Sequence, residues 1–121
     1  MKTRIPFILP FILILLFTGR AEAQNKSGVI QLYGVILNNT TDSVRVFNHA
    51  EKMIASIPVM QNQTFGGKIQ TTAGYYKLLI GREQTSLYLT PGDDIQMEVN
   101  HDDFDRTITY KGKGSAENNY L

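Results

Sequence analysis

The chain has 121 residues, contains neither cysteine nor tryptophan, and carries a formal net charge of +1 at pH 7. Without cysteine, its own residues form no disulfide and perform no thiol chemistry. No basic stripe interleaved with aromatic residues occurs in the sequence, which disfavours nucleic-acid binding.

Residues 1–23 have the three parts of a secretory signal peptide. Lys2 and Arg4 precede an apolar run that ends at Phe17, and Ala21-Glu22-Ala23 forms a small-x-small cleavage site. The run is shorter than the about 20 residues of a transmembrane helix, so we predict cleavage after Ala23, a periplasmic protein and no stable membrane span. An uncleaved N-terminal anchor is the alternative. The remaining chain has nine basic and ten acidic residues, a net charge of −1.

Residues 24–114 are predicted to form one all-β domain, beginning with five short strands. The first strand is apolar on both faces, so we expect it to be central, and Gly34 within it indicates a bulge or a close backbone approach. Pro58 cannot donate a ladder hydrogen bond, which places the third strand at an edge or gives it a bulge. The five strands are expected at residues 29–37, 43–47, 53–60, 64–69 and 75–80.

Two further strands, residues 86–90 and 94–99, flank a Pro91-Gly92 pair and alternate strictly between apolar and polar residues. A period of two is typical of strands with one buried face. Proline followed by glycine suits the centre of a type II turn, which splays its flanking strands. We therefore predict a corner at which the chain steps between sheets.

The C-terminal part is predicted to contain an acidic loop, a last strand and the start of a helix. The loop spans residues 100–105 with Phe104 buried, and the strand spans residues 106–111 with Ile108 and Tyr110 on one face. Residues 115–121 read as the beginning of a helix with Ser115 as N-cap. About eight strands with no helix between them predict an antiparallel β-sandwich or a small barrel.

Tyrosines form the most interesting candidate binding residues. If Tyr88 and one of Tyr75 or Tyr76 share an outward face, they provide a flat platform for a glycan or a peptide. The alternative is that tyrosines cap the core and form hydrogen bonds at its rim. The possible binding face consists of Tyr75, Tyr76, Tyr88 and Tyr110.

Other polar residues give weaker indications, and we predict no metal, cofactor or catalytic residue. The aspartates of residues 93–105 match no EF-hand spacing, so solvated turns are the favoured interpretation. His49 and His101 both lie in predicted polar loops, where we expect them to be exposed, because a zinc site needs three or four closely placed ligands.

Several segments together resemble a known arrangement: Gly74-Tyr75-Tyr76 and residues 87–94, 104–114 and 117–121. They look like the uncharacterised all-β N-terminal domain of exported TlpA-like thiol–disulfide oxidoreductases of Gram-negative bacteria. That resemblance implies a following linker helix, begun here by residues 115–121, and a thioredoxin-like domain as partner.

The chain departs from this family because it has no Cys-x-x-Cys motif, so no redox residue can be assigned. We expect a chain truncated before the redox domain and not itself an enzyme. Its expected role is to position the redox domain or to recognise a partner. The alternative is a stand-alone envelope module that binds a glycan or peptide through the tyrosine face.

Overall fold

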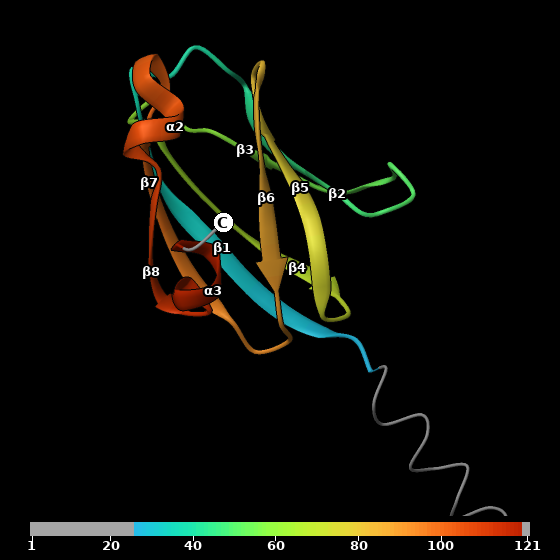
Figure 1. The fold of residues 1–121 in the computed structure, drawn as a ribbon. Helices are drawn as coiled ribbons and strands as arrows, with labels where there is room; N and C mark the ends of the chain where they lie inside the picture. The colour runs from blue at the N-terminus through green and yellow to red at the C-terminus, as the bar shows by residue number, and fades with distance from the viewer. Residues whose placement is uncertain (1–25, 120–121) are drawn as a thin grey trace, which may run out of the picture.

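A computed structural model describes residues 26–119, which form two facing four-stranded sheets (Figure 1). The predicted all-β fold is confirmed, as a sandwich. The first sheet has the order β4-β1-β7-β8 and the second β3-β2-β5-β6. The strands are β1 Gly28–Leu37, β2 Ser43–Phe47, β3 Met53–Pro58, β4 Thr64–Thr71, β5 Gly74–Ile80, β6 Glu83–Leu89, β7 Asp94–Asn100 and β8 Thr109–Lys113. The predicted signal peptide lies outside the described residues.

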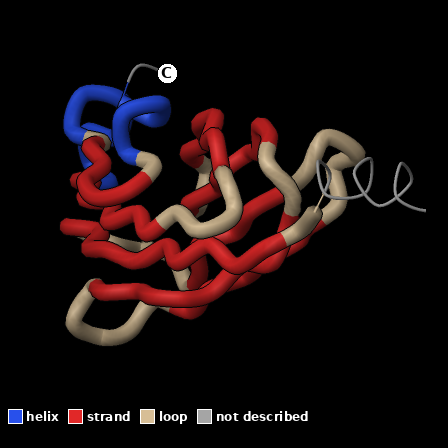
Figure 2. The backbone as a smooth tube through the Cα atoms, turned by 90° about the horizontal axis from the view of Figure 1, so that it is seen from below, coloured by secondary structure: helices blue, strands red, loops and turns tan. Residues whose placement is uncertain are grey.

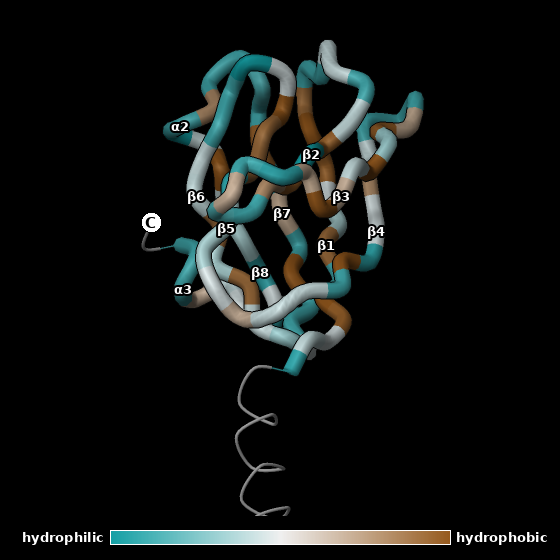
Figure 3. The backbone as a smooth tube through the Cα atoms, turned by 90° about the vertical axis from the view of Figure 1, so that its right-hand side faces the viewer, coloured by the Kyte–Doolittle hydropathy of each residue, from teal (hydrophilic) through white to brown (hydrophobic). Residues whose placement is uncertain are grey.

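Alternating apolar residues of both sheets form the core, and the connecting loops are mostly hydrophilic (Figure 3). Phe65 and Ile69 of β4 point into this core. The edge position predicted for the third strand from Pro58 is confirmed, because β3 pairs only with β2. The β2–β3 register shift lies at the other end of the strand pair, between Val46 and Phe47.

The strand β1 is central, as predicted, because it lies between β4 and β7. It pairs with β7 in parallel, whereas every other described strand pair is antiparallel, so one pair departs from the predicted antiparallel arrangement. Its outer face is also exposed, with Tyr33 39% and Leu37 40% accessible, because a sandwich covers only one face of each sheet. The close approach at Gly34 is confirmed: a Cβ atom there would collide with the carbonyl oxygen of Met97.

The corner predicted at Pro91-Gly92 is confirmed. β6 belongs to one sheet and β7 to the other, so the chain crosses the sandwich between them. The Asp93 amide donates a hydrogen bond to the Thr90 carbonyl at 2.9 Å, and Gly92 has φ +93°. These are the features of a type II turn, in which the third residue needs a positive φ.

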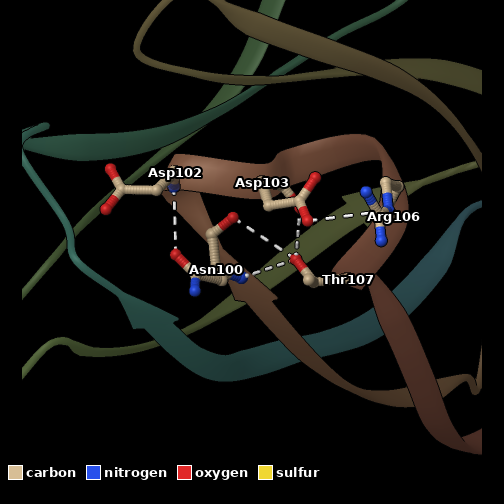
Figure 4. A network of polar contacts seen from close by, with 5 residues as sticks. All are labelled: Asn100, Asp102, Asp103, Arg106 and Thr107. Atoms are coloured by element: carbon tan, nitrogen blue, oxygen red, sulfur yellow. Dashed lines mark hydrogen bonds and ion pairs between the residues drawn. The ribbon is translucent and has the colours of Figure 1, made fainter.

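The segment between β7 and β8 is helical, which corrects the predicted loop and the start of the last strand. A 3₁₀ turn spans His101–Asp103, and α2 spans Phe104–Thr107. The Asn100 side chain accepts a hydrogen bond from the Asp102 amide at 3.0 Å, and the Thr107 hydroxyl donates to the Asp103 carbonyl at 2.7 Å (Figure 4). Such local bonds stabilise turns in competition with strands. Phe104 is buried, as predicted.

The last described element, α3 (Ser115–Asn119), confirms the predicted helix as far as Asn119. Tyr120 and Leu121 lie outside the described residues. α2 and α3 lie on the same side of the sandwich, where α2 contacts β7 and α3 contacts β8 and β6 (Figure 2). Among the described residues, no helix has the length and apolar character to cross a membrane.

Candidate functional site

Tyr75 and Tyr88 form an aromatic pair on the outer face of the second sheet. They are directly opposite each other on β5 and β6, with ring centroids 4.9 Å apart and planes inclined at 70°. Edge-to-face geometry of this kind is favourable, because the positive edge of one ring meets the negative face of the other. Tyr75 is 53% exposed and Tyr88 is partly exposed. Tyr88 and Tyr75 therefore share an outward face, which is the condition stated above for a tyrosine platform.

The other two tyrosines of the predicted face point into the sandwich. The Tyr76 hydroxyl donates to the Thr72 carbonyl at 2.7 Å and pairs with the Thr71 hydroxyl at 2.7 Å. Tyr110 belongs to the opposite sheet and is also buried. Its hydroxyl has no hydrogen-bond partner among the described residues, and burial raises the pKa of Tyr110 to about 12. The exposed tyrosine face thus contains two of the four predicted residues.

Beside this pair, Lys77 brings charge onto the same face. Its ammonium group lies 2.8 Å from Glu51 Oε2 and 5.4 Å from the centre of the Phe47 ring. The cation is therefore paired with a carboxylate while it also contacts an aromatic face. The outer face of the second sheet combines aromatic surface with a neutralised pair of charges.

Two shallow pockets, of about 210 and 280 Å³, lie against Tyr75, and both are lined by Asn48, His49, Tyr75 and Tyr76. The smaller also contacts Glu51 and Lys77, and the larger extends along residues 71–74. We call this region the Tyr75 groove. The contribution of the 48–52 loop to this groove was not predicted. Its Asn48 was the available indication, because the Asn48 side chain accepts hydrogen bonds from the Ala50 and Lys52 amides at 2.9 and 3.0 Å and shapes the turn.

The two histidines have different surroundings. His49 is exposed in the groove, as predicted for a loop residue. His101 is only partly exposed, which corrects its prediction, and its buried Nε2 has no hydrogen-bond partner among residues 26–119. The ring packs beside Gly81, where a Cβ atom would lie 3.2 Å from Nε2.

The aspartates do not gather into one site. Asp93 and Asp94 lie at the start of β7, whereas residues 102–105 follow its end. Asp93 is buried and accepts a hydrogen bond from the Thr90 amide at 2.9 Å, so it stabilises the corner. Within residues 26–119, no group of three potential metal ligands comes together.

A second constellation, not identified from the sequence, anchors α3 to both sheets. Asn118 Oδ1 accepts from the Tyr88 amide at 2.7 Å, while its Nδ2 donates to the Tyr88 and Gly114 carbonyls, each at 2.9 Å. Asn119 forms the same reciprocal pair with the Tyr110 amide and carbonyl, both at 3.0 Å. A side-chain amide offers one acceptor and two donors, so each asparagine bonds its edge strand as another strand would. We call this arrangement the asparagine anchor.

Segments that carried the family resemblance pack against one another at this anchor. Gly114 has φ +99°, and a Cβ atom there would lie 2.5 Å from the Asp93 carboxylate. A Cβ atom at Gly112 would collide with the Asp94 carbonyl oxygen. Residues 87–94 and 112–119 therefore form one close-packed unit, in which Gly112 permits the approach of the Asp94 backbone and Gly114 that of the Asp93 carboxylate.

Comparisons of this chain with known protein families, with curated proteins and with solved structures found no match.

Proposed function

We propose that this chain is the non-catalytic β domain of an exported, thioredoxin-like disulfide reductase. In that protein it positions the redox domain or recognises its partner. The observation that carries this proposal is the asparagine anchor, which joins α3 to the edge strands of both sheets. A helix tied at two points has a fixed direction, so it suits the role of holding a following domain at a set angle.

The chemistry of the chain is consistent with an accessory role. Disulfide reduction requires paired thiols with tuned pKa values, and the chain has no cysteine. Any redox step must therefore use thiols supplied by another domain or another protein. The pattern of residues 1–23 favours the periplasm as the compartment.

The size and location of the native protein test this proposal. An antibody raised against residues 24–121 would be used on periplasmic and cytoplasmic fractions of the source cells. A periplasmic band much larger than this chain, which also reacts with a thiol-specific reagent, is the expected result. A cytoplasmic band, or a large band without reactive thiols, would contradict it.

A second candidate, a stand-alone envelope binding module for a glycan or peptide, is favoured by the exposure of Tyr75 beside two pockets. Large exposed aromatic side chains contribute strongly to binding surfaces. A periplasmic band at the size of the mature chain would support this candidate and exclude the accessory role.

A further inference from the structure

We propose that the Tyr75 groove binds a neutral saccharide, with a sugar ring packed on Tyr75 and hydroxyl groups directed to its polar lining. This inference rests on the binding role proposed above and adds the class of ligand. Both pockets meet at Tyr75, so the ring can contact a ligand that occupies either of them.

The size of the groove favours small rings. Pockets that enclose drug-sized ligands have volumes of about 300 to 1,000 Å³. The two pockets at Tyr75 measure about 210 and 280 Å³, which is below that range. Each suits a single small ring, and together they suit a short oligosaccharide that passes Tyr75.

The Tyr75 ring is exposed and supported at the same time. Its exposed fraction is 53%, and the edge-to-face contact with Tyr88 at 4.9 Å supports its orientation. An aromatic face carries partial negative charge, and the C–H groups on one face of a sugar ring carry partial positive charge. Because the Tyr75 ring is already held in place, it loses little conformational freedom when a ligand binds. This low entropy cost favours the binding of sugars, which form weak contacts.

The polar lining favours a ligand without net charge. The Glu51 carboxylate and the Lys77 ammonium neutralise each other across 2.8 Å. The exposed His49 ring adds hydrogen-bonding nitrogens, and Glu51, whose side chain is 74% exposed, keeps further acceptor capacity. Such groups match the hydroxyls of a saccharide, whereas a phosphate or carboxylate would find no unpaired cation among these lining residues.

A peptide ligand fits this face less well. Extended peptides commonly bind by adding a strand to a free sheet edge. Here β5 is paired on both sides, with β2 and β6, and the backbone of Tyr88 on β6 is bonded to Asn118. The strand that carries Tyr75 therefore offers side chains and no free backbone edge, and Asn118 occupies the edge strand β6 at Tyr88, beside the aromatic pair.

The test is a titration of the protein, expressed from its full sequence, followed by amide NMR. The probes are N-acetylglucosamine, cellobiose and maltose, each up to about 50 mM, because weak sites have millimolar dissociation constants. At least one sugar is expected to shift the amides of the 48–52 loop and of Tyr75. Tyr75→Ala should raise its dissociation constant about tenfold or more, whereas Tyr75→Phe, which keeps the ring, should change it less than about threefold.

Tyr33→Ala is the matched control, because Tyr33 is also an exposed strand tyrosine but lies on the outer face of the opposite sheet. It should leave sugar affinity unchanged. The saccharide assignment is overturned if no probe shifts the groove amides, or if Tyr33→Ala weakens binding as much as Tyr75→Ala. A peptide library that selects ligands dependent on Tyr75, with no sugar bound, would also overturn it while the binding role itself stood.

Discussion

Removal of the Asn118 side chain tests whether the asparagine anchor holds the sandwich closed. Asn118→Ala deletes three hydrogen bonds and leaves the Tyr88 amide and carbonyl and the Gly114 carbonyl without their partner. Each such bond contributes about 0.5–1.5 kcal/mol, and an unsatisfied buried group costs about 1–3 kcal/mol. Because Asn118 is only 4% exposed, water does not easily replace it. We therefore expect a loss of about 3 kcal/mol, a large part of a typical total of about 5–15 kcal/mol.

Urea unfolding followed by circular dichroism measures this loss. With a slope of about 1–1.5 kcal/mol per molar urea, the midpoint should fall by roughly 2–3 M. Asn119→Ala is the matched control, because Asn119 bonds Tyr110 in the same way but is exposed, so water can replace it and about 1 kcal/mol should be lost. Hydrogen exchange at the Tyr88 amide should also accelerate in Asn118→Ala. An unfolding free energy within about 0.5 kcal/mol of the parent would refute the anchor.

Two further changes probe the core. The pKa of Tyr110 is raised from 10.0 to about 12, so the unfolded chain loses this proton first and the free energy of unfolding falls between pH 10 and pH 12. Tyr110→Phe removes this loss and an unpaired buried hydroxyl, so it should stabilise the fold by about 1 kcal/mol at pH 7 and by more at pH 11. If the variant and the parent protein had equal urea midpoints at both pH values, the burial of the Tyr110 hydroxyl would be contradicted. Gly34→Ala should destabilise by about 3 kcal/mol or more, because its Cβ collides with the Met97 backbone. Gly66→Ala in the neighbouring strand meets only Tyr33 Cβ at 3.4 Å and should change the urea midpoint little; similar losses for both glycines would disprove close approach as the cause.

Local patterns predicted most of the strands and the corner, because alternation and turn chemistry are properties of adjacent residues. The parallel pairing of β1 with β7 is not local. It joins Gly34 to Met97, which are separated in the sequence by the five strands β2 to β6, and no property of either segment identifies its partner. The helical segment was missed because its stabilising bonds, such as Thr107 to Asp103, involve residues that are equally common in loops.

The tyrosine face was only partly predictable for a similar reason. Adjacent strand residues point to opposite faces, so only one of Tyr75 and Tyr76 faces outward. The parity was available in the sequence, because Tyr76 alternates in phase with Leu78 and Ile80, which are buried. The asparagine anchor had no such pattern, since Asn118 bonds Tyr88, 30 residues earlier in the chain.

Tyr88 belongs to both proposed functional features, and this connection gives a further prediction. Its ring packs against Tyr75 in the groove, while its backbone is bonded to Asn118 of the anchor. Loss of Asn118 should therefore loosen the support of the Tyr75 ring and weaken binding of the sugar found in the titration.

We expect Asn118→Ala to raise that dissociation constant about threefold to tenfold. The measurement is amide NMR without urea, at a temperature at which the variant stays folded. Asn119→Ala is the control, because the Asn119 side chain bonds the backbone of Tyr110 in the opposite sheet and not the backbone of Tyr88. Equal affinities in both variants would mean that β5 and β6 alone hold the rings, and that the groove and the anchor are independent. A selective loss in Asn118→Ala would connect ligand binding to the direction of α3, because affinity and anchoring would then share one residue.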